Sequence, residues 1–305
     1  VGSEMCIRDR VIKALAQTTK TGLTFLLNRE TGEPIFPVEE KKVPQGAIKG
    51  DYVSKTQPFP SKPAPLNPIY FDPDEAFGFT FWDRGYCKRT AKKLRNEGLF
   101  TPPSLQGSIH YPSGVGGNNW GGPAIDHERN IMVVNTNNMA SLIVMVPRED
   151  CTKPLEELSI NKNQVRFTNI ELNEGAPYCN LRSMGFFSPL GVPCTKPPWG
   201  TLTAIDLNNG EHLWNVPLGT SKDLAPFPFW WIKGSPNMGG PTVTASGVTF
   251  IGATSDHYLR AFNTETGEEI AKFRLPTGAH ATPMTYTNNK GKQFVVIAAG
   301  GHWAI

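Results

Sequence analysis

Three stretches of the chain share one hairpin pattern, and this repeat limits the fold more than any other feature. Residues 200–214 read Gly-Thr-Leu-Thr-Ala-Ile-Asp-Leu-Asn-Asn-Gly-Glu-His-Leu-Trp, which predicts a strand over 201–207, a tight turn ending at Gly210, and a second strand. The pattern recurs over 259–271 and, earlier, over 23–36. A repeat made only of strands, without the long 3.6-residue periodicity of a helical solenoid, predicts β-propeller blades.

The composition fits a turn-rich all-β protein and argues against several function classes. The 305 residues include 30 Gly and 27 Pro, and 39% of them are hydrophobic and 19% charged, as in a globular protein. The net charge of +3 comes without a basic cluster interleaved with aromatic residues, so nucleic acid is not an expected partner. We recognise no apolar run of the roughly 18 residues that a membrane span needs, and no signal-peptide pattern.

The two ends of the sequence set the expected domain limits. Residues 1–10 (Val-Gly-Ser-Glu-Met-Cys-Ile-Arg-Asp-Arg) do not match the pattern that follows, and we interpret them as a sequencing or cloning artefact. The blade pattern begins near Val11 in the middle of one blade and stops at Ile305 before another is complete. We therefore expect 11–305 to be about three blades of a propeller domain that is truncated at both ends.

Two long insertions are expected between the blade strands. The Pro-rich residues 41–72 predict an extended connection, and 73–98 predict a helix that starts at Asp72-Pro73 and stops at Gly98. A second insertion, 149–198, interrupts one blade by about ten times the length of an ordinary connection. Insertions of this length on a propeller serve a binding site, and we expect these to cover one end of its channel.

The remaining blade strands follow from Gly-rich signals and apolar runs. Strands are expected over 107–112, 131–135 and 140–147. Gly121-Gly122-Pro123 and Gly239-Gly240-Pro241 both precede the innermost strand of a blade, where glycine lets neighbouring backbones approach the axis.

The five cysteines leave their pairing open. Cys179 and Cys194 bracket a loop rich in Pro and Gly and pair if the compartment is oxidising, but free thiols are equally compatible with the sequence. The sequence has no Cys-x-x-Cys pair, so we do not expect a structural zinc site.

Several motifs together carry a resemblance to the membrane-bound quinoprotein glucose dehydrogenases, within the wider family of pyrroloquinoline quinone dehydrogenases. The resemblance covers nearly all of 11–305. Its specific parts occur in the family's order: Lys20-Thr21-Gly22, Pro44-Gln45-Gly46-Ala47, Lys49-Gly50-Asp51-Tyr52, Thr101-Pro102-Pro103-Ser104, Asn119-Trp120-Gly121-Gly122, Ser188-Pro189-Leu190-Gly191-Val192-Pro193-Cys194, Ala281-Thr282-Pro283-Met284-Thr285-Tyr286 and Ala299-Gly300-Gly301-His302.

The resemblance implies an eight-bladed propeller with pyrroloquinoline quinone (PQQ) and a calcium ion near its axis. It implies oxidation of an aldose, usually glucose, to the lactone, with electrons passed to ubiquinone. It also implies a periplasmic location, with attachment to the inner membrane through an N-terminal anchor that lies outside this sequence.

The resemblance assigns candidate site residues one by one. Lys20 matches the lysine that reaches the quinone oxygens, where an ammonium stabilises developing negative charge; the alternative is a solvated lysine in a turn. Asn135 matches an asparagine at the cofactor, with a turn role as the alternative, and its amide can both donate and accept. Asn119 and Trp120 are expected to add a polar contact and an indole near the ring, although Trp120 could equally be propeller core.

Two further matches, Asp256 and His302, are expected near the cofactor and near the substrate entrance. A turn cap is the alternative for Asp256, and a satisfied structural histidine is the alternative for His302. Trp199 and Trp214 are assigned to structure, docked between adjacent blades.

Other roles that the family needs have no match here. The catalytic base and the calcium ligands of the family lie upstream of the lysine matched by Lys20, so we predict that this chain alone does not oxidise glucose. Dye-coupled glucose oxidation by the 305-residue chain, supplied with cofactor and calcium, would refute that prediction. Two other functions stay open: a sister enzyme for a polyol or a quinate-like cyclic acid, and a non-enzymatic propeller scaffold.

Overall fold

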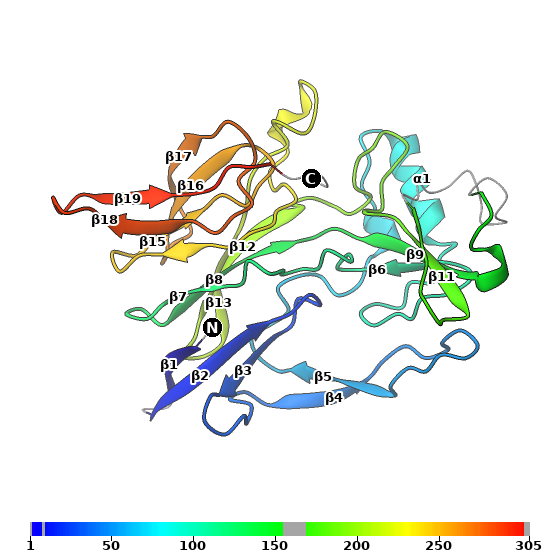
Figure 1. Ribbon diagram of the computed structural model, residues 1–305, viewed down its shortest axis with the longest axis horizontal. Coiled ribbons are helices and arrows are strands. Elements are labelled where there is room, and N and C mark those ends of the chain that lie inside the picture. The colour runs from blue at the N-terminus through cyan, green and yellow to red at the C-terminus, as the bar shows by residue number, and fades with distance from the viewer. Residues whose placement is uncertain (1, 8–9, 155–168, 302–305) are drawn as a thin grey trace.

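Strands dominate the computed structural model, which describes residues 2–7, 10–154 and 169–301. Figure 1 shows two four-stranded blades, with smaller sheets at either end of the chain and a separate strand-and-helix region beside them. The prediction of an all-β, partial propeller with insertions is confirmed. Within the described residues the sheets do not close a ring.

All blade strands pair with antiparallel neighbours. The first sheet contains β1 (Gly2–Ile7), β2 (Arg10–Thr18) and β3 (Thr24–Asn28). The first complete blade contains β7 (Ala124–Asp126), β8 (Ile131–Asn137), β12 (Gly200–Asp206) and β13 (Glu211–Pro217). The second contains β14 (Thr242–Val243), β15 (Val248–Ile251), β16 (Tyr258–Asn263) and β17 (Glu269–Arg274), and β18 (Met284–Thr287) pairs with β19 (Gln293–Val296).

The repeated hairpin forms the same turn in all three copies. Asp206 Oδ1 accepts a hydrogen bond from the amide two residues on, and Asn28 and Asn263 do so in their copies. Each turn ends on a glycine at positive φ, and Gly210 is at 74°. Only a residue without a Cβ adopts that conformation at little cost, so the sequence repeat is a structural repeat.

The core lies between successive blades. One cluster packs Ala14 and Leu26 of the first sheet against Met132 and Ile205 of the next blade. A second cluster joins Leu202 of that blade to the second complete blade. Burial between sheets, rather than within one, is what holds a propeller together.

Two contacts confirm predictions about how blades meet. A Cβ on Gly240 would lie 2.1 Å from the carbonyl oxygen of Gly121, so both innermost strands need glycine there. The indole Nε1 of Trp214 donates to the Thr264 carbonyl oxygen of the neighbouring blade at 3.0 Å. Trp199 is buried, but it lies outside the inter-blade contacts and packs among insertion residues.

The first complete blade is interrupted between β8 and β12, as predicted, but the interruption is longer than expected. The strand predicted over 140–147 forms as β9 (Ser141–Pro147), and that over 107–112 forms as β6 (Ser108–His110). Neither joins a blade. They build a separate sheet with β11 (Tyr178–Arg182) and β10 (Asn169–Glu171), because β12 takes the place beside β8.

The connection predicted over 41–72 is wrong in its first part. β4 (Val38–Lys42) pairs with β5 (Thr56–Pro60) as a hairpin. In the repeat copy over 23–36, the second strand of the hairpin reduces to one bridge, between Leu27 and Pro34.

The predicted helix exists, with other limits. Asp72 and Pro73 begin only a single 3₁₀ turn, Pro73–Glu75, and α1 spans Phe81–Ala91. Thr80 Oγ1 accepts from the Asp83 amide at 3.1 Å and caps the helix, and Asp83 Oδ2 accepts from the amide of Phe79, the residue before the cap, at 3.2 Å. The helix does not extend to Gly98. It ends at Ala91, and the chain then turns back, so that the Arg95 N–H donates to the Gly107 carbonyl oxygen.

The cysteines form two disulfides in a pattern that the sequence did not predict. Cys87 of α1 bonds Cys194, and Cys151 bonds Cys179. Cys179 and Cys194 therefore do not pair with each other, because each has a partner that is closer in space. No helix in the described part of the chain is long and apolar enough to cross a membrane.

Candidate functional site

A network of buried asparagines lies where β8 meets the second complete blade. Asn135 and Asn137 are two residues apart on β8, so both side chains point to the same face of the blade. Asn237, in the loop before β14, is fully buried and contacts both. The Asn237 backbone N–H donates to Asn137 Oδ1 at 2.7 Å, and Asn137 Nδ2 donates to the Asn237 carbonyl oxygen at 2.7 Å.

The network fixes which way the Asn135 amide faces. Asn237 Nδ2 donates to the Thr136 carbonyl oxygen at 2.9 Å, so Asn237 Oδ1 must face Asn135. Asn135 Nδ2 donates to that oxygen at 2.6 Å and to the Gly239 carbonyl oxygen at 3.1 Å. Both amide protons of Asn135 are then used. Its Oδ1 is buried and has no hydrogen-bond partner, and a buried acceptor of this kind is rare in a native fold.

Asn118 ties this network to the first sheet. Thr18 Oγ1 of β2 donates to Asn118 Oδ1, and Asn118 Nδ2 donates to the Asn135 carbonyl oxygen at 3.1 Å. The backbone of Gly117 accepts a hydrogen bond from Asn137 and donates one to the Lys20 carbonyl oxygen. The turn that carries Lys20 is therefore held against the end of β8.

Lys20 is exposed and keeps most of its hydrogen-bonding capacity. Its Nζ lies 3.4 Å from the Gly114 carbonyl oxygen, a weak contact for an ammonium with three donors. A Cβ on Gly116 would lie 2.7 Å from Lys20 Cγ, so the loop 113–117 packs directly on the lysine stem. The head group lies beside the Gly114 carbonyl oxygen and can still bind an anionic or carbonyl oxygen.

Asn119 and Trp120 lie beyond this loop and differ in exposure. Asn119 Nδ2 donates to the Val115 carbonyl oxygen at 2.7 Å, and its Oδ1 accepts from the Trp120 amide at 2.8 Å. These bonds use the side chain of Asn119 to hold the local backbone in place. Trp120 is 62% exposed, so the alternative of a core position is wrong, and its indole is open to stacking on a planar ligand.

Asp256 lies in a closed ion-pair network. It is fully buried, and its two oxygens accept from Arg260, Thr254 and Thr220, the Thr220 backbone N–H at 2.8 Å. Burial raises the pKa of this carboxyl, but the hydrogen bonds and charge of Arg260, with the two hydroxyls, outweigh that effect, so the pKa lies below its usual value. These partners occupy the acceptor capacity of both oxygens.

Two predictions concern residues or groups that the described structure does not place. His302 lies outside the described residues. The described part of the chain contains no group of three or more His, Cys, Asp or Glu side chains arranged to hold a metal ion.

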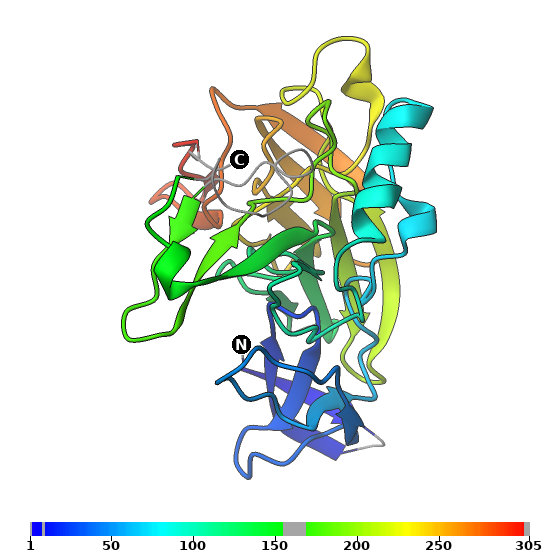
Figure 2. The same ribbon diagram turned by 90° about the vertical axis from the view of Figure 1, so that its right-hand side faces the viewer.

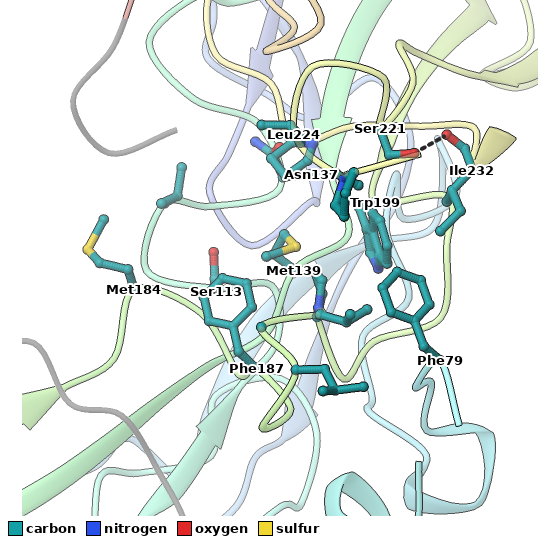
Figure 3. A pocket seen from close by; sticks show the side chains of 18 of the residues that line it. Phe79, Ser113, Asn137, Met139, Met184, Phe187, Trp199, Ser221, Leu224 and Ile232 are labelled. Atoms are coloured by element: carbon teal, nitrogen blue, oxygen red, sulfur yellow. Dashed lines mark hydrogen bonds between the residues drawn. The ribbon is translucent and has the colours of Figure 1, made fainter. Parts of the chain in front are cut away.

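A cavity of about 580 Å³ lies between the first complete blade and the insertions (Figure 3). Its walls are formed by Phe79, just before α1, by the 113–115 loop, by the end of β8, and by residues of the 184–199 and 221–238 segments. Apolar walls include Phe79, Met139, Phe187, Trp199 and Ile232. None of the described residues that line it is charged. The cavity is therefore suited to a neutral, mainly apolar molecule, and its volume is ordinary for a small-molecule site.

One polar group in this cavity has no partner. Asn137 and Ser221 line the cavity, but Asn137 is held by Asn237, and Ser221 Oγ donates to the Ile232 carbonyl oxygen at 3.4 Å, as drawn in Figure 3. Ser113 is 5% exposed, and its Oγ has no hydrogen-bond partner. Among the described lining side chains it is the one with an unused buried polar atom.

Sequence reasoning missed Ser113, Asn118 and Asn237. A signal for Asn237 was present, because Asn237-Met238-Gly239-Gly240 repeats the spacing of Asn119-Trp120-Gly121-Gly122. Ser113 carries no local signal, since only the folded insertion places it at a cavity.

Comparison with known proteins decides the family. The profile described as "PQQ: Glucose/ethanol/alcohol dehydrogenase, beta-propeller domain" matches residues 4–295. The chain belongs to this PQQ dehydrogenase family. The quinoprotein glucose dehydrogenase of Escherichia coli is 38% identical over 310 residues, covering 98% of this chain and 38% of that protein.

Relatives with other substrates in their names match almost as well. The quinate/shikimate dehydrogenase (quinone) of Acinetobacter baylyi is 37% identical and covers 93% of this chain and 35% of its own length. The glycerol dehydrogenase large subunit of Gluconobacter thailandicus is 34% identical, with 99% of this chain and 43% of that protein covered. The chain thus spans less than half the length of these relatives.

A solved structure supports the fold alone. The europium-containing methanol dehydrogenase superposes with a TM-score of 0.56 at 18% identity, covering 99% of this chain and 39% of that one. This likeness supports the propeller fold, while the family follows from the profile match.

Proposed function

We propose that the chain forms part of a PQQ-dependent dehydrogenase that oxidises glucose or another aldose to the lactone and passes the electrons to ubiquinone. The observation that carries the proposal is the unpartnered, buried Oδ1 of Asn135, on the strand whose end is hydrogen-bonded through Gly117 to the turn that carries the exposed Lys20. PQQ offers a ring N–H as donor, an ortho-quinone and three carboxylates, so this residue set fits it. The family match supports the reaction class, and the relatives named "glucose dehydrogenase" and "(quinone)" support the donor and acceptor.

The proposed roles follow from the donors and acceptors that are left free. Asn135 accepts from the ring N–H, because its own amide protons are already used. The Lys20 ammonium binds the quinone oxygens and stabilises negative charge that develops there. Trp120 offers its exposed indole to the ring plane, and Asn119 holds the backbone of that residue.

Lys20 and Asn135 would hold the cofactor, which when bound would supply an ortho-quinone as the hydride acceptor. Calcium is the second proposed cofactor, and we assign it no ligand in this chain. Asp256 is left out of the proposed site because both its oxygens are engaged. The proposed place of His302, at the substrate entrance, rests on the resemblance alone.

The proposed location is the periplasm, with membrane attachment through a segment outside this sequence. Two disulfides support an oxidising compartment, because such bonds form and persist there.

Quinate or a polyol is the alternative substrate. The quinate and glycerol dehydrogenases are 37% and 34% identical to this chain, and the glucose dehydrogenase is 38% identical. These identities are too similar to favour one of the three substrates. A substrate panel on the complete dehydrogenase, with glucose, quinate and glycerol compared by kcat/KM, ranks them.

The cofactor site is tested by titrating the chain with PQQ and following tryptophan fluorescence. Lys20→Ala should raise the Kd by about tenfold or more, the range for a charge-assisted hydrogen bond. Lys290→Ala, another exposed lysine, is the matched control and should leave the Kd unchanged. Equal Kd values for the two variants, or no saturable binding to the unmodified chain, would contradict the proposed site.

A further inference from the structure

The apolar cavity differs in the chemistry of its lining from the site proposed at Lys20. A sugar or a PQQ molecule does not suit it, because their many hydroxyls or carboxylates would be desolvated against walls that carry no charge. A neutral ring with few polar atoms loses little on entering. The unused group of Ser113 then selects for a ligand with a carbonyl oxygen, since a hydroxyl buried without a partner can donate to it.

The position of Ser113 is fixed. Its N–H donates to the Met139 carbonyl oxygen at 2.7 Å, and its own carbonyl oxygen accepts from Gly116 at 2.7 Å. Figure 3 shows Ser113 between Met184 and Met139, with its hydroxyl on the side of Leu224. The backbone bonds make the hydroxyl the only part of this residue left to bind a ligand.

The rim of the cavity continues into an apolar surface. Leu190 and Leu224 line the cavity and are 50% and 47% exposed. Beyond them Phe227 and Trp231 are 75% and 70% exposed. Figure 2 shows the segment around these residues next to α1, and Phe79 stacks on Phe229 with ring centroids 4.2 Å apart. A ligand whose ring fills the cavity could therefore lay an apolar tail over this rim.

The cavity also lies close to the proposed cofactor site. Ser113 faces the cavity, and the next residue, Gly114, directs its carbonyl oxygen toward Lys20 Nζ. The loop 113–117 thus contributes to both sites, and Asn137, on the same face of β8 as Asn135, lines the cavity. A redox partner in the cavity would be a neighbour of a cofactor held by Lys20.

We propose that this cavity binds the ring of a lipophilic quinone, with Ser113 donating a hydrogen bond to one quinone carbonyl and the tail lying over the rim. The proposal rests on the proposed function for its redox role: oxidation of the alcohol carbon releases two electrons and two protons, and the quinone takes up both pairs to leave as a hydroquinone. Binding itself needs no turnover.

Direct titration tests the site. The 305-residue chain, without PQQ, is titrated with decylubiquinone while the fluorescence of Trp199 and the other tryptophans is recorded. Ser113→Ala should raise the Kd about fivefold, the worth of one ordinary hydrogen bond. Leu224→Trp, a change at a half-exposed position that fills the mouth, should raise it more than tenfold without unfolding the chain.

Ser255→Ala is the matched control. Ser255 is also 5% exposed with an unpartnered Oγ, but it does not line the cavity, so this variant should keep the original Kd. If decylubiquinone does not bind saturably, or binds all four proteins equally, the inference is overturned. PQQ titration of the same proteins is an independent test. If the unmodified chain binds PQQ but not decylubiquinone, this inference alone is overturned. If it binds decylubiquinone but not PQQ, the proposed function alone is overturned.

Discussion

Replacement of Asp256 by asparagine separates a structural role from a cofactor role. The carboxylate holds Arg260, which is 4% exposed, through both guanidinium nitrogens, and it also accepts from Thr220 and Thr254. Asparagine keeps the volume but removes the charge and presents an N–H₂ to donors. Breaking a buried pair on one side costs roughly 3–5 kcal/mol. Arg260 retains Glu269 at 3.1 Å, so we expect a loss of about 3 kcal/mol, at the lower end of that range.

Urea unfolding followed by circular dichroism measures this loss. Glu30→Gln, which breaks an exposed pair with Lys13, is the control and should leave the free energy of unfolding unchanged. The Asp256 pKa is lowered by folding, so its stabilisation is complete above the ordinary carboxyl pKa and is lost as pH falls through the folded value. The acid-side fall in stability should therefore be smaller in Asp256→Asn. An unchanged urea midpoint, together with a weakened PQQ Kd, would refute the structural role.

Three further changes test the fold. Gly240→Ala places a methyl group against the backbone of the neighbouring blade and should cost about 3 kcal/mol or more in urea unfolding, whereas Gly300→Ala, with nothing within 4 Å, should be neutral. Cys194→Ser removes a disulfide whose cysteines are 107 residues apart and should lower the free energy of unfolding by about 4–5 kcal/mol. Adding a reductant should then destabilise this variant less than it destabilises the unmodified chain. Trp214→Phe removes the bond to Thr264 and should cost about 1 kcal/mol, and a change within error would show that the indole N–H contributes nothing.

The blade architecture was predictable because its signals are local. The turn that ends at Gly210 is encoded within a few residues by an Asp or Asn side chain and a glycine at positive φ. The Gly-Gly-Pro motifs likewise report a close backbone approach that no other residue permits. Because these motifs repeat along the chain, the blade structure can be predicted independently from each copy.

The insertions were harder to predict because their structure depends on distant partners. β9 is an apolar run like a blade strand, but β12 occupies the edge of β8, and β9 pairs with β6 and β11 in another sheet. The disulfide partners Cys87 and Cys194 are likewise 107 residues apart. The early end of α1 at Ala91 reflects the bond from Arg95 to Gly107, which helix propensity does not report.

The site shows the same division between local and distant information. Lys20, Asn119, Trp120 and Asn135 could be assigned individually, but their chemistry depends on what else binds them. For Asn135 the expectation of a group that donates and accepts becomes an acceptor alone, because Asn237 uses its protons.

The two proposed sites near the 113–117 loop call for unlike ligands. The exposed ammonium of Lys20, the unpartnered amide oxygen of Asn135 and the exposed indole of Trp120 suit a polar, anionic ring. The described lining of the cavity, with uncharged walls and the unpartnered hydroxyl of Ser113, suits a neutral one. Desolvation penalises each ligand in the other's site, since a carboxylate is costly among apolar walls and a lipophilic tail gains nothing in water. The loop can then hold a hydrophilic cofactor and a lipophilic acceptor as neighbours without either displacing the other.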